Sequence, residues 1–351
     1  MSTVDVASEV SGPVPTTAKP VTTPKWWRRL APWALLVAGA LAGIALQTQL
    51  YTADERVVGT VFMFVALATA WNLIGGFTGY PWFGQVGMFG LGAYATALLM
   101  VYLHMSFWLS MALSAVIAGL FAALIGAPLL RLKGHYFAIA TLGVAEGLRE
   151  LVNNMPKLTG GGGGITIPAL GKDAPTQWLG NDGFYLLFLA IAVATVAIAI
   201  LVSRSRAGYA LRAVAQDEDA AAAMGINTTR AKTLAFACAS AITGAVGAAA
   251  AFQIQALYPE PAFDTRITEL ALIMVMIGGA GTVLGPVIGA VAVQYMSEWL
   301  REHYTNAHTF ILGGLIILAV VLLPQGFINY LSDAVRTRRF SLLDNVRRYR
   351  L

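Results

Sequence analysis

The ionisable residues that could do chemistry are few, and three of them lie together inside an apolar stretch. Glu146, Arg149 and Glu150 occur in YFAIATLGVAEGLRELV, a segment that otherwise reads as a membrane-spanning helix. Ionisable groups within such spans are candidates for function, because a charge in lipid is costly. Arg149 follows Glu146 by three residues, so a local ion pair could neutralise the carboxylate. Glu146 is therefore a candidate for a translocation path, and structural pairing is an equally good alternative.

The sequence lacks the patterns that carry covalent or metal chemistry. It contains no GxxxxGK[ST] loop, no nucleophile elbow, no HExxH and no paired intramembrane aspartates. The four histidines show neither HxxH nor ExxH spacing, so neither a metal site nor a cofactor is expected. The single cysteine, Cys238, excludes an internal disulfide framework and is expected to be a small packed core residue. The protein is therefore not expected to be an enzyme.

The composition is that of a chain built from membrane-spanning helices. Hydrophobic residues make up 57% and charged residues 12%, and the mean hydropathy is +0.68. A soluble domain usually carries about twice that charged fraction. We predict an all-α polytopic membrane protein, a bundle of about ten transmembrane helices. The predicted spans are 33–50, 57–74, 82–103, 107–130, 137–152, 184–202, 233–252, 268–283, 285–299 and 308–323.

The positive charges predict the orientation of this bundle. Most of the 23 Lys and Arg residues fall on the same side of the spans as both termini. Because cytoplasmic segments are enriched in these residues, both termini are expected in the cytosol, in a multi-pass protein of the cell (inner or plasma) membrane. Residues 1–30 are expected to be a disordered basic cytosolic tail and 31–328 the transmembrane domain. Residues 329–351 form a second basic cytosolic tail suited to anionic lipid headgroups.

An external loop is predicted over residues 153–183, and it contains five consecutive glycines at 160–164. Glycine is conformationally permissive, so this run is expected to prevent a stable helix or strand. We expect a flexible tether. A docking or gating loop for an external partner is the alternative.

Glycines interrupt two of the apolar runs. NLIGGFTGYPWFGQVGMFGLGAYATALL begins at Asn72, and IGGAGTVLGPVIGA begins at Ile277. Gly/Pro-interrupted segments are pointers to a translocation path, since irregular backbone at membrane depth must be covered by protein or line a cavity. Equally, both could be tight cytosolic turns followed by small-residue packing faces. The candidate path or hinge residues are Gly79, Trp82, Gly84, Gln85, Gly87, Glu146, Gly278, Gly281, Gly285 and Gly289.

A charged stretch, GYALRAVAQDEDAAAAMGINTTRAKTLAF, separates two apolar spans in the predicted cytosolic loop 204–232. Asp217 and Glu218 suit a helix N-terminus, the following alanines favour helix, and Gly225 suits its C-terminal cap. A short helix over 217–224 is therefore predicted outside the bilayer. Asn227 begins the next helix, with Arg230 and Lys232 at the inner headgroup level. An interfacial helix would want bulky apolar residues on one face, so docking to a partner protein is favoured over lying on lipid.

This same stretch resembles the cytosolic motif of the LivM-type permease subunits of branched-chain amino acid ABC transporters. Gly208, Ala210, Leu211, Ala213, Asp217, Ala220, Ala221, Gly225, Ile226, Asn227, Lys232, Ala235 and Phe236 match that motif in register. The likeness continues in the two glycine-broken segments, in LRLKGHYFAIATLGVAEGLRELVNNMPKLTGG and in LLPQGFI, covering roughly residues 55 to 328. It departs at Pro81-Trp82-Phe83-Gly84-Gln85, where relatives more usually read L-S-L-G-[HQ], and in the five-glycine run.

The resemblance implies the permease of an ABC importer without its own nucleotide-binding site. It would work with a homologous second permease, two cytosolic ATPase subunits and an extracytoplasmic solute-binding protein, and it would carry branched-chain or related small amino acids. The short helix would be the coupling helix, and nucleic acid would have no role. The residues expected to couple to the ATPases are Gly208, Arg212, Asp217, Glu218, Ala220, Ala221, Gly225, Asn227, Arg230 and Lys232.

Three other functions stay open at the level of sequence. A urea or short-amide importer permease would share most of these motifs. An autonomous channel or ion-coupled carrier would move solute without partner ATPases. An intramembrane enzyme would need a reactive cluster that the sequence does not offer.

Overall fold

The computed structural model describes residues 27–47, 52–167, 180–304, 307–322 and 326–331, and these are almost entirely helical. Most of both predicted basic tails lies outside the described residues. The long helices are α1 (Trp27–Gln47), α2 (Thr52–Thr78), α3 (Gln85–Leu103), α4 (Phe107–Leu129), α5 (His135–Asn153), α8 (Gly180–Arg204), α11 (Thr228–Ile254), α13 (Arg266–Gly278), α14 (Leu284–His303) and α15 (His308–Leu322). The short elements are α6 (Pro156–Thr159), η1 (Gly161–Gly163), β1 (Ile165–Thr166), α9 (Arg206–Gln216), α10 (Glu218–Ala223), β2 (Ala256–Leu257) and α12 (Pro259–Ala262).

Each predicted span falls on one of the long helices. Within the described residues, six of them are long and apolar enough to cross a membrane: α1, α2, α3, α4, α8 and α11. The expectation of an all-α polytopic membrane protein is therefore confirmed. The number of spans beyond these six remains a prediction.

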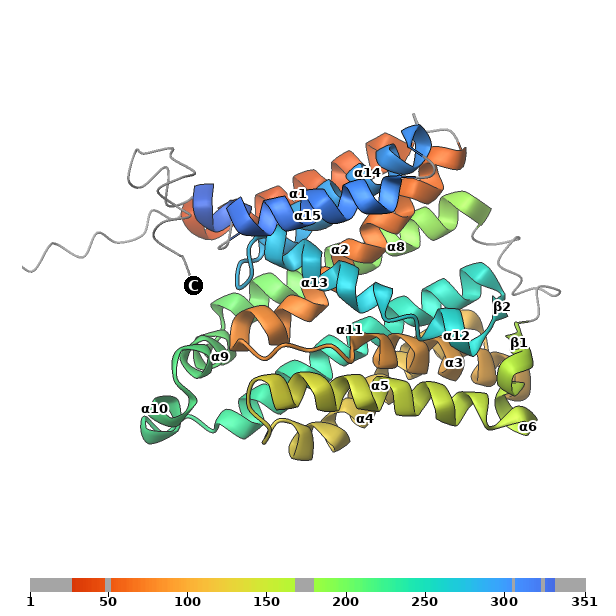
Figure 1. Ribbon diagram of the computed structural model, residues 1–351, viewed down its shortest axis with the longest axis horizontal. Coiled ribbons are helices and arrows are strands. Elements are labelled where there is room, and N and C mark those ends of the chain that lie inside the picture. The colour runs from red at the N-terminus through yellow and green to blue at the C-terminus, as the bar shows by residue number, and fades with distance from the viewer. Residues whose placement is uncertain (1–26, 48–51, 168–179, 305–306, 323–325, 332–351) are drawn as a thin grey trace, which may run out of the picture.

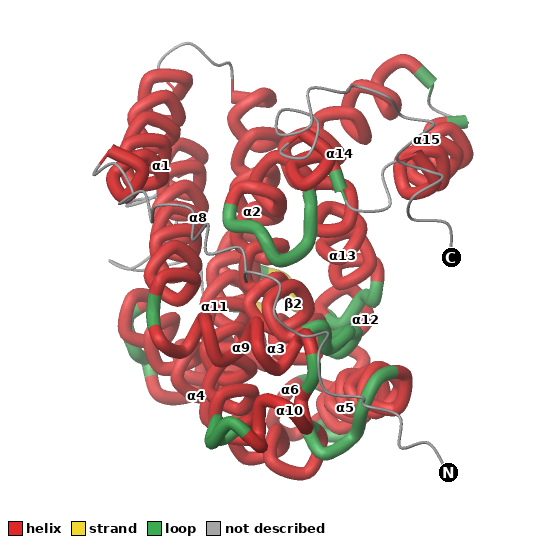
Figure 2. Tube along the Cα trace, turned by 90° about the vertical axis from the view of Figure 1, so that its left-hand side faces the viewer, coloured by secondary structure: helices red, strands yellow, loops and turns green. Residues whose placement is uncertain are grey.

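The helices pack as a bundle whose members run along its long axis (Figure 1). α11 lies at the centre, packed along α3, α4 and α2, while α2 also packs along α8. α1, α14 and α15 form one edge of the bundle, and α4 and α5 form the opposite edge (Figure 2). Alanine and glycine dominate the buried face of α11, which lets its backbone approach those of its neighbours closely.

The first glycine break is a re-entrant segment. After α2 ends, residues 79–84 run back beside it without helical structure (Figure 1). The indole Nε1 of Trp71 donates to the carbonyl of Trp82 at 2.6 Å, and the Gln85 amide donates to the carbonyl of Leu67 at 2.9 Å. Leu67 precedes the end of α2 by roughly 16 Å along the helix axis, at 1.5 Å per residue. The chain therefore begins α3 deep inside the bundle, with its irregular backbone covered by protein.

The second glycine-interrupted segment contacts the first, although roughly 200 residues separate the two in the sequence. Asn72 of α2 donates to the carbonyl of Thr282 at 2.8 Å and accepts from the backbone N–H of Gly281 at 2.9 Å. The turn between α13 and α14 needs Gly281, whose φ is +75°. One asparagine thus joins the end of α2 to the α13–α14 turn.

The remaining glycines of the second break lie where helices touch. A Cβ on Gly278 would lie 1.8 Å from the carbonyl oxygen of Gly285, and one on Gly289 would lie 1.8 Å from that of Met274. Gly84 and Gly87 show the same close approach to α5, at Thr141 and Ala145. These four glycines therefore act as small residues that let neighbouring helices pack closely, which is the alternative that the sequence left open.

The expectation that the five glycines prevent regular structure is wrong for the described part of the external loop. Residues 161–163 form a 3₁₀ turn, and β1 pairs antiparallel with β2, Ile165 opposite Leu257. The glycines permit this course because three of them, Gly160, Gly161 and Gly164, have positive φ. Residues 168–179 of the predicted loop lie outside the described residues.

Both ends of the described chain lie at one end of the bundle. Figure 1 places the start of α1 and the C-terminal end of α15 at the end where α9 and α10 lie. The β1–β2 pair and α12 lie at the opposite end. This arrangement is what an even number of spans requires.

Candidate functional site

The predicted short helix is present and is capped as the sequence suggested. Asp217 is the N-cap of α10, and its carboxylate accepts from the backbone N–H groups of Asp219 and Ala220, both at 2.9 Å. Gly225 follows the C-cap with φ +84°, a conformation that glycine adopts without penalty. Asn227 then caps α11 by accepting from the N–H of Arg230 at 2.9 Å. Local sequence therefore determines where α10 begins and ends.

Three polar side chains fasten α10 to the bundle. Glu218 accepts from the Lys232 ammonium and from the Tyr80 hydroxyl, each at 2.5 Å. Lys232 also donates to the Tyr80 hydroxyl at 2.9 Å and to the carbonyl of Leu130 at 2.8 Å. An ammonium has three N–H donors, and Lys232 has three acceptors here. We call Tyr80, Glu218 and Lys232 the anchoring triad.

Lys232, expected with Arg230 at the inner headgroup level, has a buried side chain. Its side chain is only 2% exposed, because Tyr80, Leu130 and Glu218 surround the ammonium. A buried charge needs such partners to offset its lost hydration. Lys232 is thus a structural connection between α11, the re-entrant segment and α10, while Arg230 is exposed.

The charges around α10 favour the ionised form of Glu218. Burial alone would raise its pKa, but hydrogen bonds from Lys232 and Tyr80 outweigh burial and hold the pKa below the usual value. On the outer side, Lys133 pairs with Asp219 at 3.2 Å, and this hydrogen bond raises the pKa of Lys133. Both groups of that second pair are largely exposed, so it contributes little to stability.

The other face of α10 is exposed, and among the described residues its one ion pair is that of Asp219 with Lys133. Ala221 is fully buried against the bundle, whereas Asp219, Ala220, Ala222 and Ala223 are exposed. Met224, at the tip, is 72% exposed. Figure 1 shows α9 and α10 protruding beyond the ends of the neighbouring helices. We call residues 219, 220 and 222–224 the exposed α10 face.

The predicted coupling residues divide into two groups. Gly208, Arg212, Glu218, Ala221, Asn227 and Lys232 hold the unit in place, as when the Arg212 guanidinium donates to the carbonyl of Ser203 and lies over the Phe77 ring. Asp217, Ala220, Gly225 and Arg230 are exposed. Sequence reasoning missed Tyr80 and Lys133. Only the three-dimensional contacts bring Tyr80 and Lys133 to α10.

Buried polar groups surround the re-entrant segment. Gln85 is fully buried and donates to Leu67 and to the Thr243 hydroxyl. The Gln85 Oε1, the Trp82 Nε1 and the Ser240 Oγ have no hydrogen-bond partner among the described residues. The Trp82 ring packs edge-on against Phe236 within the core. In this conformation the predicted path residues Trp82, Gly84, Gln85 and Gly87 are buried in a closed interior, whereas Gly79 is exposed.

Glu146 forms an ion pair with Arg149 of the same helix, which was the alternative to a place in the translocation path. Arg149 donates to Glu146 and, at 3.2 Å, to Glu150. All three side chains are partly or largely exposed on the outer face of α5. Their exposure separates them from the closed interior around Gln85.

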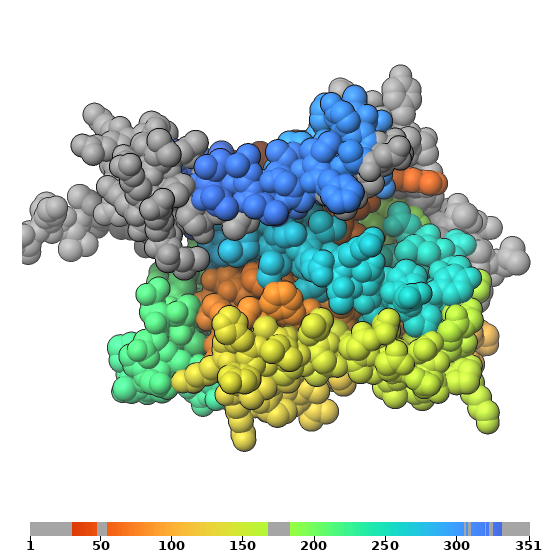
Figure 3. Space-filling model, viewed as in Figure 1, coloured from red at the N-terminus to blue at the C-terminus, as the bar shows by residue number. Residues whose placement is uncertain are grey.

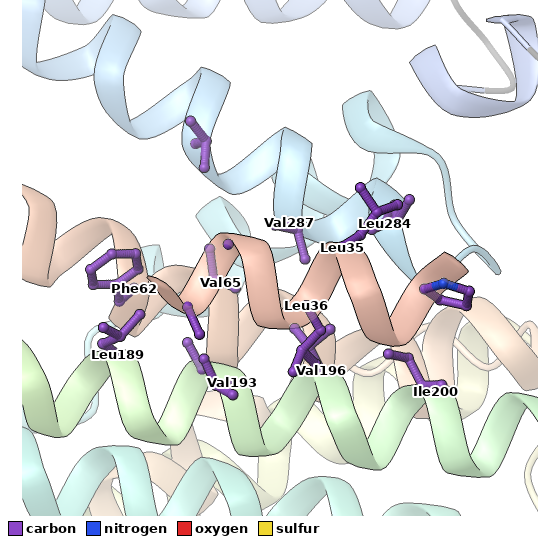
Figure 4. Close-up of a pocket in the computed structure, with 15 residues that line it drawn as sticks. Leu35, Leu36, Phe62, Val65, Leu189, Val193, Val196, Ile200, Leu284 and Val287 are labelled. Carbon is purple, nitrogen blue, oxygen red and sulfur yellow. The ribbon is translucent and has the colours of Figure 1, made fainter. Parts of the chain in front are cut away.

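The structure also contains an apolar groove, and its lining argues against a solute site. It encloses about 250 Å³ between α1, α2, α8 and α14, and aliphatic residues such as Leu36, Val65 and Val196 line it (Figure 4). A zwitterionic solute would need polar partners for both charges. The groove offers none, so its lining suits hydrocarbon instead.

A bundle of apolar helices with a re-entrant segment and a protruding anchored helix is the fold of a multi-pass membrane protein. The family model described as "Branched-chain amino acid transport system / permease component" matches residues 55–320, and the chain belongs to this family. It is 28% identical over 319 residues to the high-affinity branched-chain amino acid transport system permease protein LivM of Salmonella typhimurium (strain LT2). The LivM protein of Escherichia coli (strain K12) is similar to the same extent. Each alignment covers 84% of this chain and 72% of the relative. No solved structure matches the chain.

Proposed function

We propose that the chain is the permease subunit of an ABC importer that moves branched-chain amino acids into the cytosol across the inner membrane. Family membership and the named relatives support the substrate class. Two cytosolic ATPases would drive it, and a second permease and an extracytoplasmic binding protein would complete it. The full bundle would have about ten spans with both termini in the cytosol.

The proposed mechanism rests on the two faces of α10. One face is exposed, and the other is hydrogen-bonded to the bundle. Glu218 joins α10 to Tyr80 of the re-entrant segment and to Lys232 of α11. A displacement of α10 by an ATPase would therefore move both elements together. The re-entrant segment leads directly to Gln85, deep within the bundle. The anchoring triad would in this way transmit motion from the cytosolic face to the interior.

The buried polar groups near that segment provide sites for a passing solute. The Gln85 Oε1, Trp82 Nε1 and Ser240 Oγ lack partners among the described residues. Such groups are costly when buried and unpaired. When the path opens, they would bond to water or to the charged ends of an amino acid. The closed interior would then be one state of the alternating cycle.

The exposed α10 face can be tested by Met224→Asp. A carboxylate at this apolar tip should disfavour docking and reduce co-purification of the ATPases at least tenfold, because a charge at the centre of a contact must be desolvated. Leucine uptake into proteoliposomes with all subunits and ATP should fall in parallel.

The matched control is Ser106→Asp at the opposite end of the molecule. Ser106 is the exposed N-cap of α4, where aspartate is equally suitable. Ser106→Asp should leave both the co-purification of the ATPases and the uptake of leucine unchanged. Normal ATPase recovery with Met224→Asp would refute docking at this face, and ATP-independent flux through this chain alone would instead support a channel or carrier.

A further inference from the structure

A polar pocket lies at the end of the bundle opposite α10, and neither the coupling through α10 nor the closed interior uses it. The last turn of α5, the 3₁₀ turn η1 and the segment that leads from β2 into α12 surround this pocket, which encloses about 500 Å³. α5 and α12 lie side by side at the surface there (Figure 3). Its charged and polar lining contrasts with the aliphatic groove between α1 and α8.

The five-glycine run forms one wall of the pocket. Positive φ values at Gly160, Gly161 and Gly164 set the course of the chain, and Gly162 between them lines the pocket. The pairing of β1 with β2 holds this turn beside the start of α12. A Cβ on Gly162 would lie 3.3 Å from the Oδ1 of Asn153, which also lines the pocket. A larger residue at position 162 would therefore fill part of this space, and the glycine run keeps it open.

The lining of the pocket carries both signs of charge. Arg149 donates from Nη2 to Glu146 and, at 3.2 Å, to Glu150. A guanidinium has five N–H donors, and among the described residues only those of Nη2 have acceptors. The exposed carboxylate of Glu260, on α12, has no hydrogen bond or ion pair within the described part of the chain. The pocket therefore has both N–H donors and a carboxylate available to a ligand.

These groups match the two charged ends of a free amino acid. The Glu260 carboxylate suits an α-ammonium group, and the remaining donors of Arg149 with the side-chain amide of Asn153 suit an α-carboxylate. Tyr258, which is 49% exposed, and the two prolines that flank Glu260 add apolar surface for an aliphatic side chain. The described residues contain no group of three or more His, Cys, Asp or Glu side chains that could hold a metal ion. A zwitterion therefore fits the pocket better than a metal cation does.

We propose that this pocket is an entry site that binds a free aliphatic amino acid at the extracytoplasmic end of the bundle. The inference rests on the proposed function, which supplies the amino-acid substrate and places this end outside the cytosol. α5 runs from the pocket to the re-entrant segment, where Thr141 and Ala145 approach Gly84 and Gly87 closely. The entry site and the closed interior thus share one helix, and the amino acid would bind at the pocket before the interior opens.

Saturation-transfer difference NMR on the purified full chain in lipid nanodiscs tests the pocket directly. Leucine should bind, and isocaproate, which has the same carbon skeleton without the ammonium group, should not. Gly162→Leu should weaken leucine binding at least tenfold, because the new side chain fills the pocket. Gly163→Leu is the matched control and should bind leucine normally, since a Cβ there meets nothing within 4 Å and residue 163 does not line the pocket. Equal binding of leucine and isocaproate, or normal leucine binding by Gly162→Leu, would overturn the proposal.

A second pair of variants tests the carboxylate without changing the shape of the pocket. Glu260→Gln should also weaken leucine binding at least tenfold, because it removes the partner of the ammonium group. Glu302→Gln, at an exposed carboxylate in the last turn of α14, should not. Leucine binding by Glu260→Gln that equals that of the wild-type chain would contradict the entry site.

Uptake by the complete transporter separates this inference from the proposed function. If the wild-type complex takes up leucine with ATP while the purified chain does not bind leucine, the entry site is refuted and the importer function stands. Absence of ATP-driven leucine uptake by the wild-type complex would instead refute the proposed function.

Discussion

At the scale of single residues, Lys232 is the most informative side chain. Sequence alone placed it at the inner headgroup level and did not predict which groups surround its ammonium. Its actual burial depends on Tyr80 and on the carbonyl of Leu130, which are distant in sequence. No local sequence pattern encodes the contacts of Lys232 with these two residues. The caps Asp217, Gly225 and Asn227 were predictable because capping is a local property.

Lys232→Met should destabilise the protein strongly. It leaves Glu218 as a mostly buried carboxylate without its cation, and breaking one partner of such a pair costs on the order of 3 kcal/mol. A lower melting temperature of the purified protein would show this. Adding Glu218→Gln should recover part of the loss, because the unpaired charge is then removed. Unchanged melting of the single variant would mean that the triad does not hold α10.

The same triad predicts how the attachment of α10 depends on pH. The folded-state pKa of Glu218 is below its unfolded value, so the attachment stabilises fully at pH values above the unfolded pKa, about 4.3 for a glutamate. It is lost as the pH falls through the folded value. Limited proteolysis of the loop between α9 and α11 should therefore be constant from about pH 5 upward and accelerate in stronger acid. Glu218→Gln should remove this dependence.

At the scale of elements, the helices were predictable from hydropathy and the path of the chain between them was not. Each predicted span overlaps a helix, although 268–283 runs five residues past the end of α13, since long apolar runs leave few alternatives. The interruption at Gly79 to Gly84 was also visible in the sequence. Its return into the bundle was not, because that course depends on bonds from Trp71 and Gln85 to backbone carbonyls. The external glycine run was misjudged, since pairing of β1 with β2 is a long-range contact.

Gly84→Ala tests the packing of the re-entrant segment against α5. The added Cβ would lie 2.2 Å from the carbonyl oxygen of Thr141, so one backbone must shift. Overpacking of this kind typically costs 1–3 kcal/mol, so roughly that loss of stability is expected. Thermal unfolding measures it. Gly39→Ala in α1, where a Cβ meets nothing within 4 Å, should melt no lower than the unmodified protein, because alanine favours helix over glycine, and equal melting of both variants would contradict the described packing.

At the scale of the whole molecule, the two ends of the bundle and its two edges have different roles in the proposed importer. α10 protrudes at the end where the described chain starts and finishes, and the β1–β2 pair lies at the other end (Figure 1). α5 offers a charged, glycine-containing face along one edge. α1 and α15 on the opposite edge have apolar exposed faces. Such a distribution suits a subunit with an ATPase contact at the α10 end and a lipid surface along the edge that contains α1 and α15.

The central claim is that force from the ATPases enters through α10. Cysteine-directed crosslinking in the assembled transporter tests it most directly, with Cys238→Ala as background and Met224→Cys or Ser106→Cys as the single thiol. We predict that a short bifunctional reagent joins position 224, but not position 106, to the ATPase subunit, with a yield that changes when ATP is added. A transporter that takes up leucine at the normal rate but forms no crosslink from position 224 would contradict it.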